Sequence, residues 1–109
     1  MTGPMRAWTG AVDTATLDGA TVITYAAVPQ RHVITGVAWS YDAAPAGGHL
    51  TITDGGVTIF QVAITAGGPG FFMFPYPKMG TANSAMVITL ADPGGQIVGC
   101  LNVLNHWVE

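Results

Sequence analysis

The chain of 109 residues contains very few charged side chains: three lysine or arginine and six aspartate or glutamate residues, 8% of the total. Ordinary soluble domains carry about 25%. A folded monomer of this mass exposes on the order of 5,700 Å², so each charge would serve roughly 600 Å² of surface. The simplest explanation is that much of this surface faces other protein.

Basic residues are scarcer than acidic ones. The chain has only Arg6, Arg31 and Lys78, and they are scattered along the sequence. No basic face can form, which disfavours binding to nucleic acid and to anionic membrane surfaces. The apolar runs are short and broken by Gly or Pro, so no transmembrane helix is predicted. Residues 1–10 lack the apolar core of a signal peptide, and we expect the protein to be made and to fold in a cytoplasm.

Metal ligands are equally sparse. The single cysteine, Cys100, cannot form an internal disulfide or a thiolate cage. We expect it to be a small buried apolar residue; it would be a nucleophile only if a histidine lay beside it. The three histidines His32, His49 and His106 have no His-x-His spacing, and the only glutamate is the terminal Glu109. The sequence therefore predicts no metal site and no cofactor.

Catalytic motifs are missing too. The only serines, Ser40 and Ser84, do not lie in a Gly-x-Ser-x-Gly elbow. Among the carboxylates, Asp42, Asp54 and Asp92 stand beside Gly, Pro or Ala in sequences that favour turns. We therefore expect a protein that is not an enzyme.

The sequence is rich in glycine and β-forming residues instead. It has 15 Gly and 7 Pro, which disfavours long helices, and it is 50% hydrophobic, which is enough for a core. Short runs of Val, Ile and Thr alternate with Gly, Pro and Asp clusters. This pattern predicts an all-β, antiparallel β-sandwich, jelly-roll-like, with seven to eight strands. The candidate strands are 20–28, 32–41, 48–54, 56–65, 70–75, 84–91 and 96–104.

The first residues differ from the rest because they show no clear hydrophobic period. We interpret residues 1–19 as an extended N-terminal arm and residues 20–109 as the β-sandwich domain. The arm would be ordered on a neighbouring molecule, as Trp8 suggests, or would be a frayed terminus.

Two hairpins are predicted from turn sequences. The turn at 92–95, Asp-Pro-Gly-Gly, would pair strands 84–91 and 96–104, with Leu90 opposite Ile97. The turn at Asp54-Gly55 would pair strands 48–54 and 56–65, with Ile52 opposite Val57. In the second hairpin the alternation slips, so either a bulge lies near residue 60 or the strand is buried on both sides, and we favour the bulge. In strand 32–41 we expect Trp39 to be a central core residue rather than a platform for a ligand.

The most unusual segment is 67–80, which reads Gly-Gly-Pro-Gly-Phe-Phe-Met-Phe-Pro-Tyr-Pro-Lys-Met-Gly. Its prolines exclude a central strand and favour an edge strand. We expect one side of residues 71–76 to pack in the core of its own subunit and the other side to pack on a neighbouring chain. The alternative is that the whole segment is buried within one subunit. The predicted interface residues are Trp8, Phe71, Phe72, Met73, Phe74 and Tyr76.

Three stretches carry a resemblance to known proteins. They are VITGVAWSYDAAPAGGHLTITDGG, FQVAITAGGPGFFMFPYP and VITLADPGGQIVGCLNVL. They resemble a group of small β-sandwich proteins encoded among the virion structural genes of tailed bacteriophages, over about two-thirds of the chain. The resemblance implies a role in the virion, as a capsid decoration (cement) protein or as part of a head or tail fibre. It carries over no functional residues.

These observations predict a non-enzymatic bacteriophage virion structural protein, a capsid decoration protein that self-associates and docks on the shell. Its partners would be itself, as a homotrimer of the kind that three-fold positions on viral shells accept, and the major capsid protein or another virion protein. We expect it in the virion, which is assembled in the host cytoplasm.

The alternative is a carbohydrate-binding or host-attachment module of a phage fibre or tail. Trp8, Tyr41, Tyr76 or Trp107 would then stack on sugars. The chain has few polar side chains that could orient sugar hydroxyls, so we favour the structural role.

Overall fold

The computed structural model describes residues 11–45, 47–94 and 97–108. This part of the chain contains eight strands and no helix. The strands are β1 (Ala11–Asp18), β2 (Thr21–Tyr25), β3 (Arg31–Tyr41), β4 (His49–Asp54), β5 (Val57–Ala63), β6 (Gly70–Met79), β7 (Met86–Leu90) and β8 (Val98–Val108).

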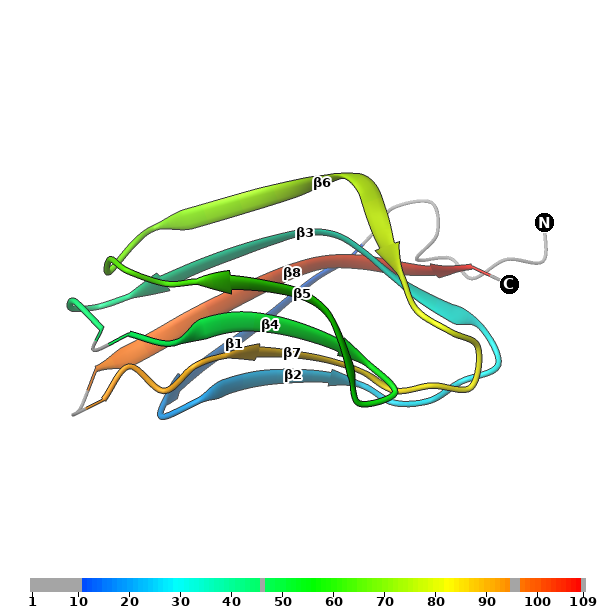
Figure 1. Cartoon of the computed structure of the whole chain (residues 1–109), viewed down its shortest axis with the longest axis horizontal. Coiled ribbons are helices and arrows are strands. Elements are labelled where there is room, and N and C mark those ends of the chain that lie inside the picture. Colours follow the sequence, from blue (N-terminus) through cyan, green and yellow to red (C-terminus); the bar gives the residue numbers. More distant parts are fainter. Residues whose placement is uncertain (1–10, 46, 95–96, 109) are drawn as a thin grey trace.

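The strands form two four-stranded antiparallel sheets, in the orders β1-β8-β3-β6 and β2-β7-β4-β5 (Figure 1). The hairpin of β4 and β5 lies at the middle of the chain, and successive pairs outward from it join β3 to β6, β2 to β7 and β1 to β8. These pairs alternate between the two sheets. A long hairpin wound around itself in this way is a jelly roll. The predicted fold class is therefore confirmed.

The core lies between the two sheets and follows the period-two pattern of strands with one buried face. In β7, Met86, Ile88 and Leu90 are fully buried and alternate with half-buried residues. The facing strand β8 contributes Leu101 and Val103, which are also fully buried. Trp39 departs from the prediction of a central core residue. It is half-buried and packs against the margin of the core.

The sandwich already includes residues 11–18, ahead of the boundary predicted at residue 20. Residues 11–18, assigned to the arm from the sequence, form β1 and pair with β8 from Ala11 opposite Asn105 to Asp18 opposite Val98. The run Ala-Val-Asp-Thr-Ala-Thr-Leu-Asp has few large apolar residues, so its sequence carries only a weak strand pattern. Trp8 and the rest of the expected arm lie outside the described residues.

The predicted hairpin of strands 84–91 and 96–104 is wrong. β7 and β8 belong to opposite sheets, and Leu90 pairs with Thr21 and Leu50 rather than with Ile97. Within the described part of this turn, the Gly94 amide donates to Asp92 Oδ1 at 2.9 Å. Both strands have alternating apolar residues, and this alternation has two possible explanations. The strands can pair side by side in one sheet, or they can face each other across a core. The connection between β7 and β8 crosses the sandwich.

The second predicted hairpin is confirmed, with a different register. Gly55 and Gly56 have φ of 56° and 86° and form a two-residue turn, which places Asp54 opposite Val57. The pairing then shifts, so that Ile52 lies opposite residue 60 instead of Val57. Residue 59 is the extra residue of the bulge that the slipped alternation indicated.

The Tyr41 side chain links the end of β3 to the segment that connects β7 with β8. Its hydroxyl donates to the Ala91 carbonyl at 2.8 Å. Burial, and then the nearby charge of Asp92, raise the pKa of the Tyr41 phenol above its ordinary value of 10.0. The folded state therefore holds this proton more tightly than the unfolded state does.

We expect Tyr41→Phe to lose about 1 kcal/mol of stability through the missing hydrogen bond. In the wild type, the stability that depends on protonated Tyr41 is fully present below about pH 10 and is lost as the pH rises above it. This part of the alkaline loss should be absent from Tyr41→Phe. Urea unfolding of both proteins at neutral and at alkaline pH measures the difference. Equal alkaline losses in the two proteins would contradict the assignment.

Candidate interaction surface

β6 lies at the end of its sheet, as its prolines predicted, and it pairs only with β3. Its first part pairs regularly, from Gly70 to Met73, and the pairing resumes at Lys78. Between Met73 and Lys78, four residues of β6 stand against one residue of β3, so β6 bends away from its neighbour (Figure 1). Pro75 and Pro77 lie in this excursion and supply no backbone N–H donor.

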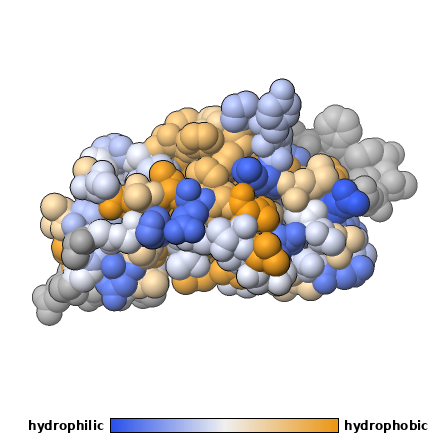
Figure 2. Space-filling model, viewed as in Figure 1, coloured by the Kyte–Doolittle hydropathy of each residue, from blue (hydrophilic) through white to orange (hydrophobic). Residues whose placement is uncertain are grey.

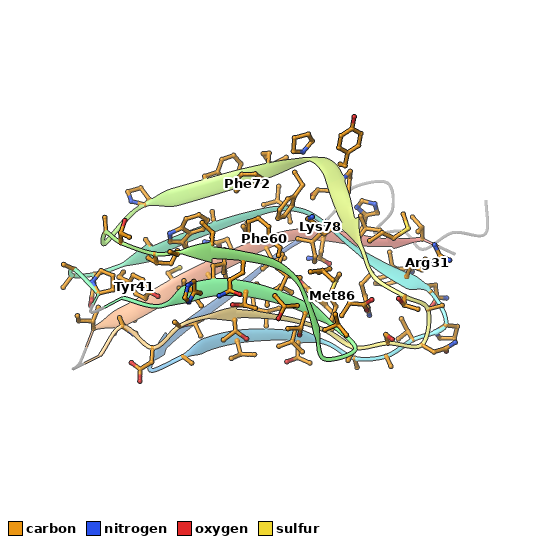
Figure 3. The ribbon with its side chains drawn as sticks, viewed as in Figure 1. Arg31, Tyr41, Phe60, Phe72, Lys78 and Met86 are labelled. Atoms are coloured by element: carbon orange, nitrogen blue, oxygen red, sulfur yellow. The ribbon has the colours of Figure 1, made fainter. Side chains whose placement is uncertain are left out.

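The inner side of β6 closes the gap between the two sheets. Phe74 is 7% exposed, and its ring lies 4.8 Å from that of Phe60 on β5, nearly perpendicular to it. The Phe72 ring lies 5.1 Å from Phe74 and 5.5 Å from Phe60. Figure 3 shows Phe60 and Phe72 on the neighbouring edges of the two sheets. Lys78 Nζ lies 5.8 Å from the centre of the Phe74 ring, a distance typical of a cation–π contact.

The outer side of β6 is apolar and open to solvent. Five of the seven large hydrophobic side chains that are exposed in the described part of the chain belong to this strand. Figure 2 shows the hydrophobic colour gathered along the upper side of the molecule, where β6 runs in Figure 1. We call these residues the β6 surface, and their exposed fractions are 61% for Phe71, 41% for Phe72, 49% for Met73, 88% for Tyr76 and 49% for Met79.

The β6 surface is large for a protein of this size. Each of its side chains exposes on the order of 100 Å², given that an aromatic side chain can bury about 150–250 Å². The total is roughly 500 Å², within the range of about 300–600 Å² at which the largest patch of a monomer is often functional. The Met73 side chain lies over Gly36 of β3, where an added Cβ would overlap its sulfur.

The two sides predicted for residues 71–76 are thus both present. Phe74 belongs to the core side, whereas Phe71, Met73 and Tyr76 face outward, and Phe72 lies between the two. The alternative, in which the whole segment is buried within one subunit, is wrong. The contact with a neighbouring chain stays a prediction. Met79, which was not among the predicted interface residues, joins the β6 surface because the strand continues past the prolines.

The polar residues considered for chemistry serve the fold. Asp42 Oδ1 accepts from the Val98 amide at 2.9 Å, and Asp54 accepts from the amide and the hydroxyl of Thr81 at 3.2 and 2.8 Å. The buried His32 has its Nε2 2.8 Å from the Ala26 carbonyl. Cys100 is half-buried rather than buried.

The candidate metal ligands are not brought together. Within the described ranges, no group of three His, Cys, Asp or Glu residues could hold a metal ion. Of the aromatic residues considered for sugar stacking, Trp8 lies outside the described residues, and the other three lie on three different strands. Tyr41 is 7% exposed with its hydroxyl bonded, Trp107 is half-buried on β8, and Tyr76 is fully open on β6.

A small hollow lies where β5 ends and β6 begins. Its volume is about 180 Å³, and we call it the Trp39 pocket. The indole of Trp39 lies so close to Gly70 that a Cβ there would overlap the ring, which makes glycine necessary at this position. No sequence pattern indicated this pocket, because it forms only where Trp39 of β3 lies against residues 63–70. The lining residues are Trp39, Ala63, Ile64, Thr65, Ala66, Gly68, Pro69 and Gly70.

Comparison of the chain with protein-family models, with curated proteins and with solved structures found no match. No helix among the described residues is long and apolar enough to cross a membrane. The function is therefore inferred from the residues of this chain alone.

Proposed function

We propose that this protein is a non-enzymatic structural protein that works by self-association and by docking on a larger assembly. The observation that carries the proposal is the β6 surface: one edge strand exposes five large apolar side chains on a chain with only three basic and six acidic residues. Surfaces of this kind mark sites of protein–protein contact.

The size of the β6 surface supports an anchoring role. Burying roughly 500 Å² of apolar surface contributes on the order of 12 kcal/mol at about 25 cal/mol per Å². Association costs about 4–15 kcal/mol of lost freedom. The β6 surface can therefore anchor an association, provided that the neighbour adds contacts around it.

The backbone of β6 favours closed assemblies over open-ended ones. An exposed flat edge strand invites further strands and aggregation. Pro75 and Pro77 remove two donors, and the bend at residues 74–77 takes the backbone out of register. The side chains of β6 are thus available to a partner, while the bend and the two prolines interrupt the edge that an added strand would need beyond Met73.

A role in a bacteriophage virion, as a capsid decoration protein, agrees with the three sequence stretches that resemble virion β-sandwich proteins. The jelly roll also occurs in viral capsid domains and in lectins, although a fold alone does not define a function. Mass spectrometry of purified particles of the phage that encodes this chain tests the proposal. Many copies per particle would support decoration, and a few would support a fibre or tail component. Absence from the particle would contradict a virion role.

The alternative, a carbohydrate-binding or host-attachment module, has one observation in its favour, which is the exposed ring of Tyr76. Along β6 the only other polar side chain is Lys78, so sugar hydroxyls would find few partners. Binding of the isolated protein on a glycan array, abolished by Tyr76→Ala, would support this alternative. We expect no such binding.

A further inference from the structure

The excursion of β6 presents Tyr76 as a protruding ring. Four residues stand against one residue of β3 here, and Tyr76 is 88% exposed, more than any other large hydrophobic residue described. Pro75 and Pro77 flank it and fix their own φ angles. Tyrosine is enriched among the residues that carry most of the binding energy at interfaces, which favours a role for this ring as an anchor.

The Trp39 pocket has the size and chemistry for a single aromatic ring. Its volume is about 180 Å³, whereas sites for drug-sized ligands measure about 300–1,000 Å³. An apolar cavity of about 150 Å³ is known to accept benzene. The walls combine an indole, Pro69 and Ile64 with polar atoms, and none of the lining residues is charged. An uncharged aromatic side chain fits this site better than a charged or extended ligand.

A second copy of the chain can supply that ring, whereas the same copy cannot. Tyr76 lies six residues beyond Gly70, the β6 residue in the pocket wall. At about 3.3 Å per residue, the two positions are roughly 20 Å apart along the strand. A tyrosine side chain does not span this distance. Both features are present once on every copy, so each copy offers one protruding ring and one pocket.

We propose that Tyr76 of one copy inserts into the Trp39 pocket of the next copy. This inference rests on the self-association proposed above and specifies its geometry. The contact joins two different surfaces, so it is head-to-tail, and repetition closes a ring when the rotation permits. Phe71 and Met73 lie between Gly70 and Tyr76 along the same strand, on its outer side. A ring of three copies is the trimer predicted from the sequence.

Complementation between two variants tests the inference. Tyr76→Ala removes the ring but keeps the pocket, and Thr65→Trp fills the pocket but keeps the ring, because Thr65 is an exposed lining residue. Each variant alone should be a folded monomer, with association weakened about tenfold or more. Their mixture should form a heterodimer, in which Tyr76 of the second variant enters the pocket of the first. Sedimentation equilibrium measures the masses, and circular dichroism confirms the fold.

The matched control is Tyr76→Phe, which keeps the ring and should assemble like the wild type. Wild-type protein that assembles while Tyr76→Ala assembles equally well would overturn the inference and leave the proposed self-association intact. Two monomeric variants that form no heterodimer, well above the concentration at which the wild type assembles, would also overturn it. A wild-type protein that is itself monomeric would instead contradict the proposed self-association.

Discussion

Phe71→Asp is expected to leave the subunit folded and to abolish its self-association. Phe71 is 61% exposed on the outer side of β6, so its replacement removes little from the core. In the assembly, the change loses about 2 kcal/mol from burial of the ring. It also places a carboxylate in an apolar contact, where an unpaired charge is costly. Light scattering measures the mass, and thermal unfolding followed by circular dichroism measures the fold.

The matched control for this prediction is Val22→Asp. Val22 is also exposed, at 45%, but it lies on β2 in the other sheet, at the edge opposite to that of β5. This variant adds the same charge to the same protein and should keep the mass of the wild type. Equal loss of assembly in both variants would show that charge in general, rather than the β6 surface, controls association.

Phe74→Asp is expected to unfold the subunit. Phe74 packs against Phe60 and Phe72 at ring distances of 4.8 and 5.1 Å and is almost fully buried. Truncation of a buried Phe typically costs about 3–5 kcal/mol, and a buried carboxylate adds several more. Their sum approaches the whole stability of a small domain, about 5–15 kcal/mol. Urea unfolding and circular dichroism measure the loss.

Phe74→Leu serves as the comparison for this variant, because it keeps an apolar side chain and should remain folded with a smaller loss of stability. A folded but monomeric Phe74→Asp protein would reverse the assignment of the two sides of β6. Phe74 would then belong to the contact and not to the core.

The sequence predicted those features that depend on local chemistry. The glycines after Asp54 indicated the hairpin of β4 and β5, and the slipped alternation indicated its bulge, because turn conformation and strand period are local properties. The prolines of β6 likewise predicted an edge strand. The two-sided character of residues 71–76 followed from an apolar run with no polar face.

The features that the sequence did not predict depend on distant pairing. The alternation in β7 and β8 did not reveal that these strands face each other across the core instead of pairing. β1 was missed because an edge strand rich in Thr and Asp has no strong hydrophobic period. The Trp39 pocket brings Trp39 of β3 against Gly70 of β6, and no local motif marks such a contact.

The mass of the wild-type protein in solution, measured by light scattering over a range of concentrations, tests the central claim most directly. If the β6 surface joins copies of the chain, the protein forms a discrete oligomer at micromolar concentration, and its subunits separate without unfolding on dilution. A protein that remains a folded monomer throughout that range would contradict the claim that this surface drives self-association.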